Sequence, residues 1–275
     1  MTANIQRRTL GILSLALAGA AAYPHASAFA QGFGLHVSPP RFELSAKPGE
    51  KVREAIQVTN PNLALGRYAA HTADWTLSEK GALQFNEGDP TSGSCRPWVR
   101  IERRQFSVSP NATRTYRFEV HIPDDAKPGE CRFALMLGSD PAAEQGVNVG
   151  NINLPIGGQI GVIVYVAIGG AQPKLVYKGL RKETVDSAVV PVAIIENAGG
   201  AHGRPEGVLR GTDASGKEFE MMVNAIPILP GQTRAVPIYG INPDGSAGAN
   251  FAFPVRMKGT IEWDGGKQEI DAIVR

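Results

Sequence analysis

Residues 116–122 read YRFEVHI, in which apolar and polar side chains alternate without a break. Alternation with a period of two is typical of a β-strand that buries one face and exposes the other. Phe133, Leu135 and Leu137 recur at the same spacing. No segment carries the apolar spacing of an amphipathic helix of three turns. The sequence therefore predicts an all-β protein.

Turn-forming residues separate the predicted strands at short intervals. They include Lys47-Pro48-Gly49, Ser109-Pro110-Asn111 and Lys127-Pro128-Gly129. Short strands at such spacing indicate antiparallel sandwiches or barrels. The 32 Gly and 20 Pro among the 275 residues also argue against a helix bundle.

The rhythm of strands is interrupted at Gly169–Pro173 and resumes with Leu175 and Tyr177. We place a linker at this interruption. The expected architecture is two immunoglobulin-like β-sandwich domains in tandem, over residues 33–168 and 172–275, preceded by a signal peptide.

Residues 1–30 have the composition of a secretory signal peptide. Arg7 and Arg8 precede an apolar run at 10–22 that is too short to span a bilayer. Ala28-Phe29-Ala30 supplies a small-x-small cleavage site, so we expect cleavage near Ala30. Sec export and twin-arginine export both stay open. No later stretch reaches 18 unbroken apolar residues, so we expect no membrane insertion of the mature protein.

The charge of the mature chain argues against one class of partner. The whole chain has 28 basic and 26 acidic residues, and the signal peptide contains Arg7, Arg8 and no acidic residue. The mature protein therefore has equal numbers of basic and acidic residues. A nucleic-acid partner bound through a basic surface is not expected.

The chain has two cysteines, Cys95 and Cys131. In an exported protein, such a pair most simply forms one structural disulfide. A catalytic thiol or a metal ligand is the alternative, but the sequence has no CxxC motif. The histidines of the mature chain show no ligand spacing either. We therefore expect no metal and no other cofactor.

Sequence motifs of catalysis are absent: there is no GxSxG, HExxH, GxxxxGK[ST] or GxGxxG. Gly211–Lys217 is one residue short of a phosphate loop and is better interpreted as a hairpin turn. Asp74-Trp75 could line a sugar site, but a Trp on a strand is more often part of a core. We expect that the protein is not an enzyme, with a carbohydrate-active enzyme as the weakest alternative.

Residues 147–166 read VNVGNINLPIGGQIGVIVYV, which contains no charged side chain. The apolar residues of its first half alternate with Asn and Gly and are Val147, Val149, Ile152, Leu154 and Ile156. A charge-free strand that projects beyond a sandwich is an aggregation hazard unless something covers it. The pattern leaves two interpretations open. The segment is either a strand lent to another chain's unfinished sheet or a long central strand buried within this protein.

Residues 37–44, VSPPRFEL, resemble the first strand of periplasmic pilus-assembly chaperones of the PapD-like type, in which an arginine precedes alternating apolar residues. Ile56–Asn60 is similar to the second strand of that family. Further matches to its D, E and F strands are Phe106–Pro110, Tyr116–Ile122 and Arg132–Leu137. The uncharged stretch falls where the family has its G strand. The resemblance is close over 35–168 and only architectural over 172–275.

This resemblance implies a periplasmic chaperone that binds and stabilises pilin-like subunits for fimbrial assembly. Its G strand would complete the sandwich of a subunit that lacks its last strand, which is called donor-strand complementation. Family members hold the subunit's C-terminal carboxylate with an Arg and a Lys, and Arg41 matches the Arg. The implied partner-binding residues are Arg41, Val147, Val149, Ile152, Leu154 and Ile156. An outer-membrane usher and a self-capping dimer are further partners on this interpretation.

One position departs from the family pattern. The family's lysine lies on the G strand shortly before a tyrosine, but Leu154–Tyr165 contains neither Lys nor Arg, and Val162 occupies that position. Another cation substitutes, or Arg41 acts alone, or the chain is a divergent paralogue with a different client. The alternative to a chaperone is an exported structural or adhesive module that binds through its sandwich loops.

Overall fold

The computed structural model describes residues 34–78, 81–140, 146–149, 152–155, 157–242 and 244–275. The predicted signal peptide, 1–30, lies outside the described residues. The described part contains twenty β-strands and one 3-10 helix, Arg96–Trp98. The all-β prediction is therefore confirmed. None of the described helical structure has the length and apolar character needed to cross a membrane.

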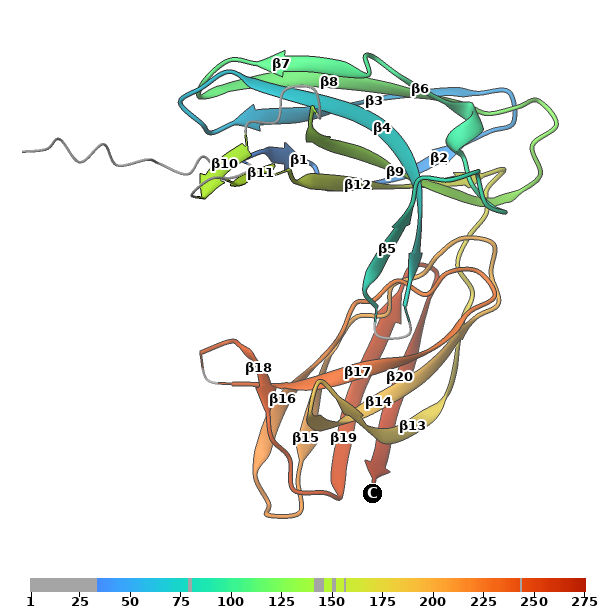
Figure 1. The fold of residues 1–275 in the computed structure, drawn as a ribbon. Helices are drawn as coiled ribbons and strands as arrows, with labels where there is room; N and C mark the ends of the chain where they lie inside the picture. Colours follow the sequence, from blue (N-terminus) through green and yellow to red (C-terminus); the bar gives the residue numbers. More distant parts are fainter. Residues whose placement is uncertain (1–33, 79–80, 141–145, 150–151, 156, 243) are drawn as a thin grey trace, which may run out of the picture. The chain divides into compact units, whose positions relative to one another are not determined.

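The first sandwich consists of two sheets that enclose one core (Figure 1). One sheet has the order β1 (His36–Ser38), β3 (Lys51–Asn60), β8 (Ala112–His121) and β6 (Val99–Ile101). The other has the order β2 (Arg41–Ala46), β12 (Gln159–Ile168), β9 (Gly129–Ser139), β4 (Gly66–Leu77) and β5 (Leu83–Asn86), with β7 (Gln105–Val108) also paired to β4. The predicted alternation supplies the core, which includes Ile56, Tyr116, Phe118, Phe133 and Leu135.

The chain changes sheets between β1 and β2, at Pro39-Pro40. β1 pairs with β3 in one sheet, whereas β2 pairs in parallel with β12 in the other. Proline has no N–H to donate to a ladder, so two successive prolines interrupt the pairing at this point. As a result, β2 accompanies only the second half of β12, from Ile163 to Ile168.

The second sandwich is built from one path of paired strands. Its order is β13 (Leu175–Val185), β14 (Ala188–Asn197), β17 (Thr233–Ile241), β16 (Glu218–Val223), β15 (Val208–Thr212), β19 (Val255–Trp263) and β20 (Gly266–Val274), with β18 (Ala247–Ala249) beside β17. β17 belongs to both layers, because residues 233–237 pair with β14 and residues 238–240 pair with β16. The two layers enclose a core that includes Leu209, Met221, Val236, Ile238 and Met257.

The predicted linker contains a local turn. Gly169 and Gly170 have φ values of +63° and +76°, a left-handed conformation that favours glycine. β12 ends just before this pair, and β13 begins at Leu175. The strands of the two sandwiches fall on either side of the turn, and the domain boundaries 33–168 and 172–275 stay a prediction.

The uncharged stretch is divided differently from the single strand that we predicted. β10 (Gly146–Val149) pairs antiparallel with β11 (Ile152–Pro155), and β12 follows as a separate strand. The chain therefore reverses direction between Val149 and Ile152. Only two residues, Gly150 and Asn151, separate the two strands, and a Gly-Asn pair is a favourable hairpin connection. Val147 and Val149 thus lie on the strand before the reversal, opposite the strand of Ile152 and Leu154.

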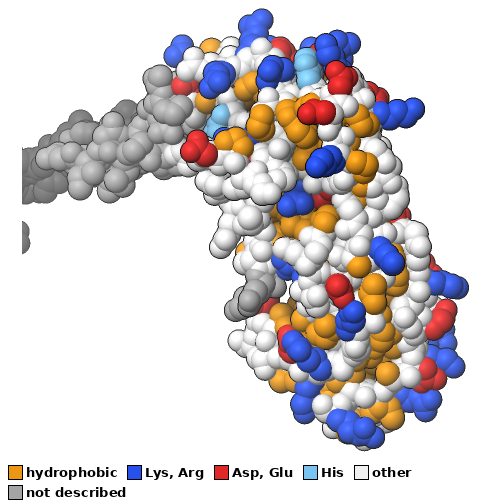
Figure 2. Space-filling view, turned by 90° about the vertical axis from the view of Figure 1, so that its right-hand side faces the viewer, with side chains coloured by type: hydrophobic (Ala, Val, Ile, Leu, Met, Phe, Trp, Pro, Cys, Tyr) orange, Lys and Arg blue, Asp and Glu red, His pale blue; other side chains and the backbone are white. Residues whose placement is uncertain are grey.

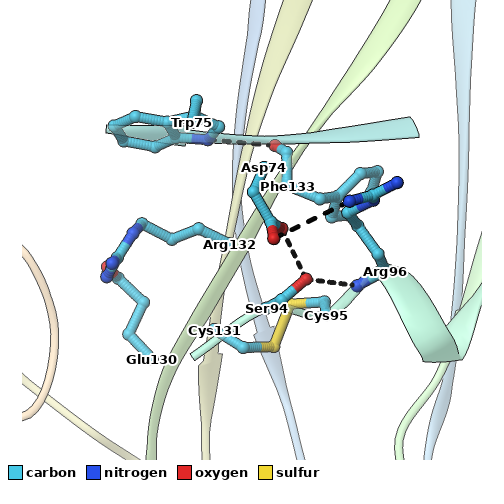
Figure 3. Close-up of a disulfide and its surroundings, with 9 residues drawn as sticks. All are labelled: Asp74, Trp75, Ser94, Cys95, Arg96, Glu130, Cys131, Arg132 and Phe133. Carbon is cyan, nitrogen blue, oxygen red and sulfur yellow. Dashed lines mark hydrogen bonds and ion pairs between the residues drawn. A yellow bond between two sulfur atoms is a disulfide. The ribbon is translucent and has the colours of Figure 1, made fainter. Parts of the chain in front are cut away.

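Cys95 and Cys131 form the disulfide that the sequence predicts (Figure 3). The bond joins the N-terminal end of the 3-10 helix to β9. Beside it, Asp74 accepts hydrogen bonds from the Thr91 N–H at 2.7 Å and from the Ser94 hydroxyl at 2.5 Å. These contacts fix the loop that carries Cys95 against β4.

Trp75 is buried, as its core interpretation requires, at 4% exposure. Its indole Nε1–H donates to the carbonyl oxygen of Phe133 at 3.2 Å, which ties β4 to β9 (Figure 3). The carboxylate and the indole of Asp74-Trp75 therefore have structural partners within the first sandwich.

Replacing both cysteines, as Cys95→Ala/Cys131→Ala, should lower the free energy of unfolding. The disulfide closes a loop with a sequence separation of 36. A loop of this length contributes roughly 4 kcal/mol in the chain-entropy model. Urea denaturation of the mature protein measures the loss, and reduced wild type should unfold at the same denaturant concentration as the variant. A loss below about 1 kcal/mol would contradict the expectation.

Candidate partner-binding site

The outer face of β2, β12 and β9 carries a cluster of charged and aromatic side chains. Alternation along each strand sends one set of residues into the core and the other set outward. On β12, Val162, Val164 and Val166 are fully buried in the core. The side chains between them belong to the outer face, where Tyr165 packs beside Trp75 with ring centroids 5.2 Å apart.

Strand register brings residues of the outer face into one row. Tyr165 of β12 lies opposite Glu43 of β2 on one side and opposite Arg132 of β9 on the other. Arg41 of β2 lies opposite Ile163. The row therefore places an aromatic ring between an acidic and a basic side chain.

His202, from the segment that follows β14, completes the cluster. Its ring stacks on that of Tyr165 with the centroids 3.7 Å apart. Its Nδ1 lies 2.6 Å from Glu130 Oε2, and its backbone N–H donates to the same oxygen at 2.8 Å. The Glu130 side chain is only 1% exposed and is also paired with Arg132 at 3.3 Å. Glu130 is thus a buried carboxylate with three polar contacts, which hold its side chain in one position.

Glu43 is the second carboxylate of the cluster and contacts two arginines and a histidine. Its Oε1 lies 2.8 Å from Arg41 Nε, 3.3 Å from Arg204 Nε and 3.5 Å from His202 Nε2. Arg204 also donates from Nη2 to the Tyr165 hydroxyl at 3.1 Å and from Nη1 to the Ala225 carbonyl at 3.2 Å. Arg204 is therefore held in place by partners other than Glu43.

The environment of this cluster shifts two pKa values. Partial burial opposes ionisation of Glu43, but the nearby His202, Arg41 and Arg204 outweigh it and lower the pKa of its carboxyl. Burial raises the pKa of the Tyr165 hydroxyl to about 12. At neutral pH the site therefore contains an ionised Glu43 beside a neutral tyrosine.

A short open edge lies next to the cluster. Ile163 donates its N–H to the Pro40 carbonyl at 3.1 Å, so the odd-numbered residues of β12 direct their backbone groups toward β2. By this alternation, Gln159 and Gly161 direct theirs to the same side. β2 begins only at Arg41, opposite Ile163, and no other described strand pairs with this side of β12. Within the described part of the chain, Gln159 and Gly161 therefore have no strand partner on this side of β12.

Arg41, predicted from the sequence, lies where the open edge ends. Its side chain is 48% exposed and is paired with Glu43. Val162, where the resemblance leads us to expect a lysine, is fully buried in the core, so its side chain faces away from the cluster. The side chains of Val147, Val149, Ile152 and Leu154 are not described, and Ile156 lies outside the described residues.

Of the residues in this cluster, the sequence analysis assigned a partner-binding role only to Arg41 and missed Glu43, Glu130, His202 and Arg204. Glu43 falls within the quoted first strand. Nothing in the sequence around it indicates its contacts with Arg204 and His202. His202 and Arg204 lie 72 and 161 positions away from the carboxylates that they contact. No local motif joins residues so far apart.

Both signs of charge occur on the face of the molecule that Figure 2 draws. Figure 2 shows basic and acidic side chains spread over the visible face, together with hydrophobic ones. Among the described residues, no group of three or more His, Cys, Asp or Glu side chains is arranged to hold a metal ion.

The sequence matches no known family model and no curated protein. Solved structures nevertheless align along most of the chain. The class 5 fimbriae chaperone CfaA aligns at 10% identity over 88% of this chain and 99% of its own, with a TM-score of 0.47. The E. coli chaperone DraB aligns at 16% identity over 89% and 98% of the two chains, with a TM-score of 0.44.

A third structure is the CsuC–CsuE chaperone–tip adhesion subunit pre-assembly complex from Csu pili of Acinetobacter baumannii. It aligns at 10% identity over 88% of this chain and 98% of its own, with a TM-score of 0.44. At these identities and TM-scores the likeness assigns no role to this chain.

Glu43→Gln should make stability depend less on pH. The folded-state pKa of Glu43 is lowered, so its contribution is present above the unfolded value of 4.5 and is lost as the pH falls through the folded value. At pH 7 the variant should be less stable than wild type by about 0.5–1 kcal/mol, as expected for a partly exposed ion pair. Urea denaturation at pH 7 and about pH 3 measures whether this gap closes in acid.

Glu218→Gln is a matched control, since Glu218 is exposed on β16 and contacts none of these groups. Its stability difference from wild type should be small at both pH values. A gap for Glu43→Gln that widens on acidification would contradict the assignment.

Proposed function

We propose that this protein is a periplasmic chaperone that binds and stabilises pilin-like subunits for fimbrial assembly by donor-strand complementation. The observation that carries the proposal is the open edge of β12, which ends at Arg41. It is supported by the uncharged sequence before β12 and by the cluster of charged and aromatic side chains beside the edge. The role requires no catalytic group, nucleotide or metal.

The open edge suggests how a client strand would pair. Gln159 and Gly161 present backbone donors and acceptors to which an added strand can bond. The added strand would extend along β11 and the first half of β12 until it meets β2 at Arg41. In return, Ile152, Leu154 and Ile156 would fill the groove of a client that lacks its last strand. Each such side chain contributes roughly 1.5–3 kcal/mol before ordering costs.

The position of Arg41 suggests what lies at the end of the client strand. A strand that runs parallel to β12, as β2 does, would end with its C-terminus next to Arg41. A terminal carboxylate there would receive a charge-assisted hydrogen bond from the guanidinium. The proposed contact therefore fixes the register of the client as well as its affinity.

The remaining predicted residues have a supporting role in this proposal. Val147 and Val149 lie on β10, which pairs with β11 on one side. β10 would back the donated strand, while the opposite side of β11 receives the client. We further propose a periplasmic location after cleavage near Ala30, with an outer-membrane usher as the acceptor of the complex. Pairing of two open edges would give a self-capping dimer of the free protein.

Ile152→Asp/Leu154→Asp should abolish client capture while the fold is retained. Charged side chains cannot enter an apolar groove without a large desolvation cost. Tagged mature protein would be used to recover partners from periplasmic extract, with identification by mass spectrometry. The matched control is Val208→Asp/Ile273→Asp, which changes two apolar residues of the second sandwich that are 58% and 50% exposed. A small secreted subunit should be recovered with wild type and the control only.

Equal recovery with the Ile152→Asp/Leu154→Asp variant would reject strand donation. Recovery of no subunit even with wild type would favour the exported structural or adhesive module instead. Circular dichroism of each variant establishes that the fold is retained.

Arg41→Met should weaken binding of the recovered subunit by roughly tenfold to hundredfold, the loss expected for a hydrogen bond between charged groups. Arg53→Met is the matched control, since Arg53 also pairs through Nε with a glutamate, Glu119, at 2.7 Å. Arg53 lies on β3 in the opposite sheet. Titration calorimetry with the purified subunit compares the two variants. Equal affinities for both would argue against an anchor at Arg41.

A further inference from the structure

Gly161 lies on the open half of β12 and is covered by an aromatic ring from another strand. Val162 faces the core, so its neighbour Gly161 faces the outer side of the sheet. A Cβ atom at Gly161 would lie 2.6 Å from Cζ and 2.8 Å from Cε1 of Phe85, and 3.2 Å from Sδ of Met136. The Phe85 ring therefore occupies the space that a side chain at this position would fill.

Phe85 belongs to β5, whose apolar residues remain open to solvent. Phe85 and Leu83 are two residues apart on this strand and therefore point to the same face of it. They are 41% and 45% exposed. The ring thus contacts Gly161 and still presents apolar surface to solvent. It does so at the part of β12 that has no partner on one side among the described strands.

The hairpin that carries Phe85 is held in place. The last residues of β4 pair with β5 rather than with β9, so the hairpin projects from the first sandwich (Figure 1). Arg234, which is 9% exposed, donates from Nη2 to the carbonyl oxygens of Leu77 and Ser78 at 3.2 and 3.0 Å. The Ser78 hydroxyl accepts a hydrogen bond from the Ala82 N–H at 3.0 Å. A ring on a hairpin fixed in this way loses little conformational freedom when a partner binds.

A strand that pairs with the open edge would place one side chain against this ring. Neighbouring strands lie about 4.8 Å apart, and residues opposite each other point to the same face of the sheet. The client residue opposite Gly161 would therefore project from the outer face next to Phe85. An apolar or aromatic side chain there would cover the exposed part of the ring, whereas a short polar side chain would leave it in water.

We infer that Phe85 is a specificity-determining residue, which selects an apolar or aromatic side chain at the client position opposite Gly161. Gly161 is then a positioning residue, because its lack of a side chain lets the ring lie against β12. This deepens the proposed function and rests on it, since the client strand is the ligand. The contact lies outside the groove that Ile152, Leu154 and Ile156 would fill, and it involves no charged group. It adds selection by side chain to pairing through the backbone.

The test uses the full mature protein and the purified subunit that is recovered with wild type. Each residue of the subunit's C-terminal strand is replaced by serine in turn, and titration calorimetry measures the affinity of each subunit variant for wild type and for Phe85→Ser. At one position the loss of affinity should be about tenfold larger with wild type than with Phe85→Ser, as expected for a buried apolar contact. A merely structural role of Phe85 would weaken binding of all subunit variants alike.

Three further variants separate the contact from effects on the fold. Phe85→Tyr keeps the ring and should retain the selectivity of wild type. Gly161→Ala should reduce the same selectivity, because its methyl group would displace the ring. Met222→Ser is the control for loss of an exposed apolar residue, since Met222 is 42% exposed and lies on β16 of the second sandwich. It should leave the affinity of every subunit variant unchanged.

If no position of the subunit strand depends on Phe85, the inference is overturned and the chaperone role is kept. A change of selectivity in Met222→Ser equal to that in Phe85→Ser would overturn it as well. Dependence on Phe85 in a subunit whose capture survives Ile152→Asp/Leu154→Asp would retain the contact and reject strand donation. Recovery of no subunit with wild type would reject the chaperone role and the inference together.

Discussion

The change of sheet at Pro39-Pro40 is the constraint on which the candidate site depends. A continuous strand at this position would cover the whole of β12 and leave no edge. Because the two prolines interrupt the ladder, β2 starts late and covers β12 only from Ile163 onward. The same break places Arg41 at the first position of β2, so the open edge and the cation at its end have one structural cause.

The outer-face cluster combines a buried carboxylate, Glu130, with a partly exposed one, Glu43. Glu130 is buried and satisfied by His202 and Arg132, and β9, which carries Glu130, is held by the disulfide at Cys131. Breaking a buried pair of this kind leaves an uncompensated charge, so this part resists change. Glu43 makes contacts of similar length but is 41% exposed, so its ion pairs are weakened by solvent.

Local patterns in the sequence predicted what local physics determines. The strand at 116–122 and the pairing of Cys95 with Cys131 were both confirmed. A half-buried strand is visible in the sequence as alternation, and two cysteines allow only one pairing. The reversal between Val149 and Ile152 was missed because the absence of charge suggested one long strand, although Gly150-Asn151 is itself a turn signal. The contact of Arg204 with Glu43 spans 161 positions and leaves no local trace.

A cation on β12 itself would have to occupy a position that faces the outer surface. An inward-facing position such as Val162 is part of the core, where a lysine would carry an unpaired charge into apolar surroundings. A cation on the segment after β14 reaches the outer face without disturbing the alternation of β12. Arg204 does so with a planar fork that bonds Glu43, Tyr165 and Ala225 at once, which a lysine could not reproduce in the same geometry. The cluster therefore combines residues of β2, β9 and β12 of the first sandwich with residues of the segment after β14 of the second.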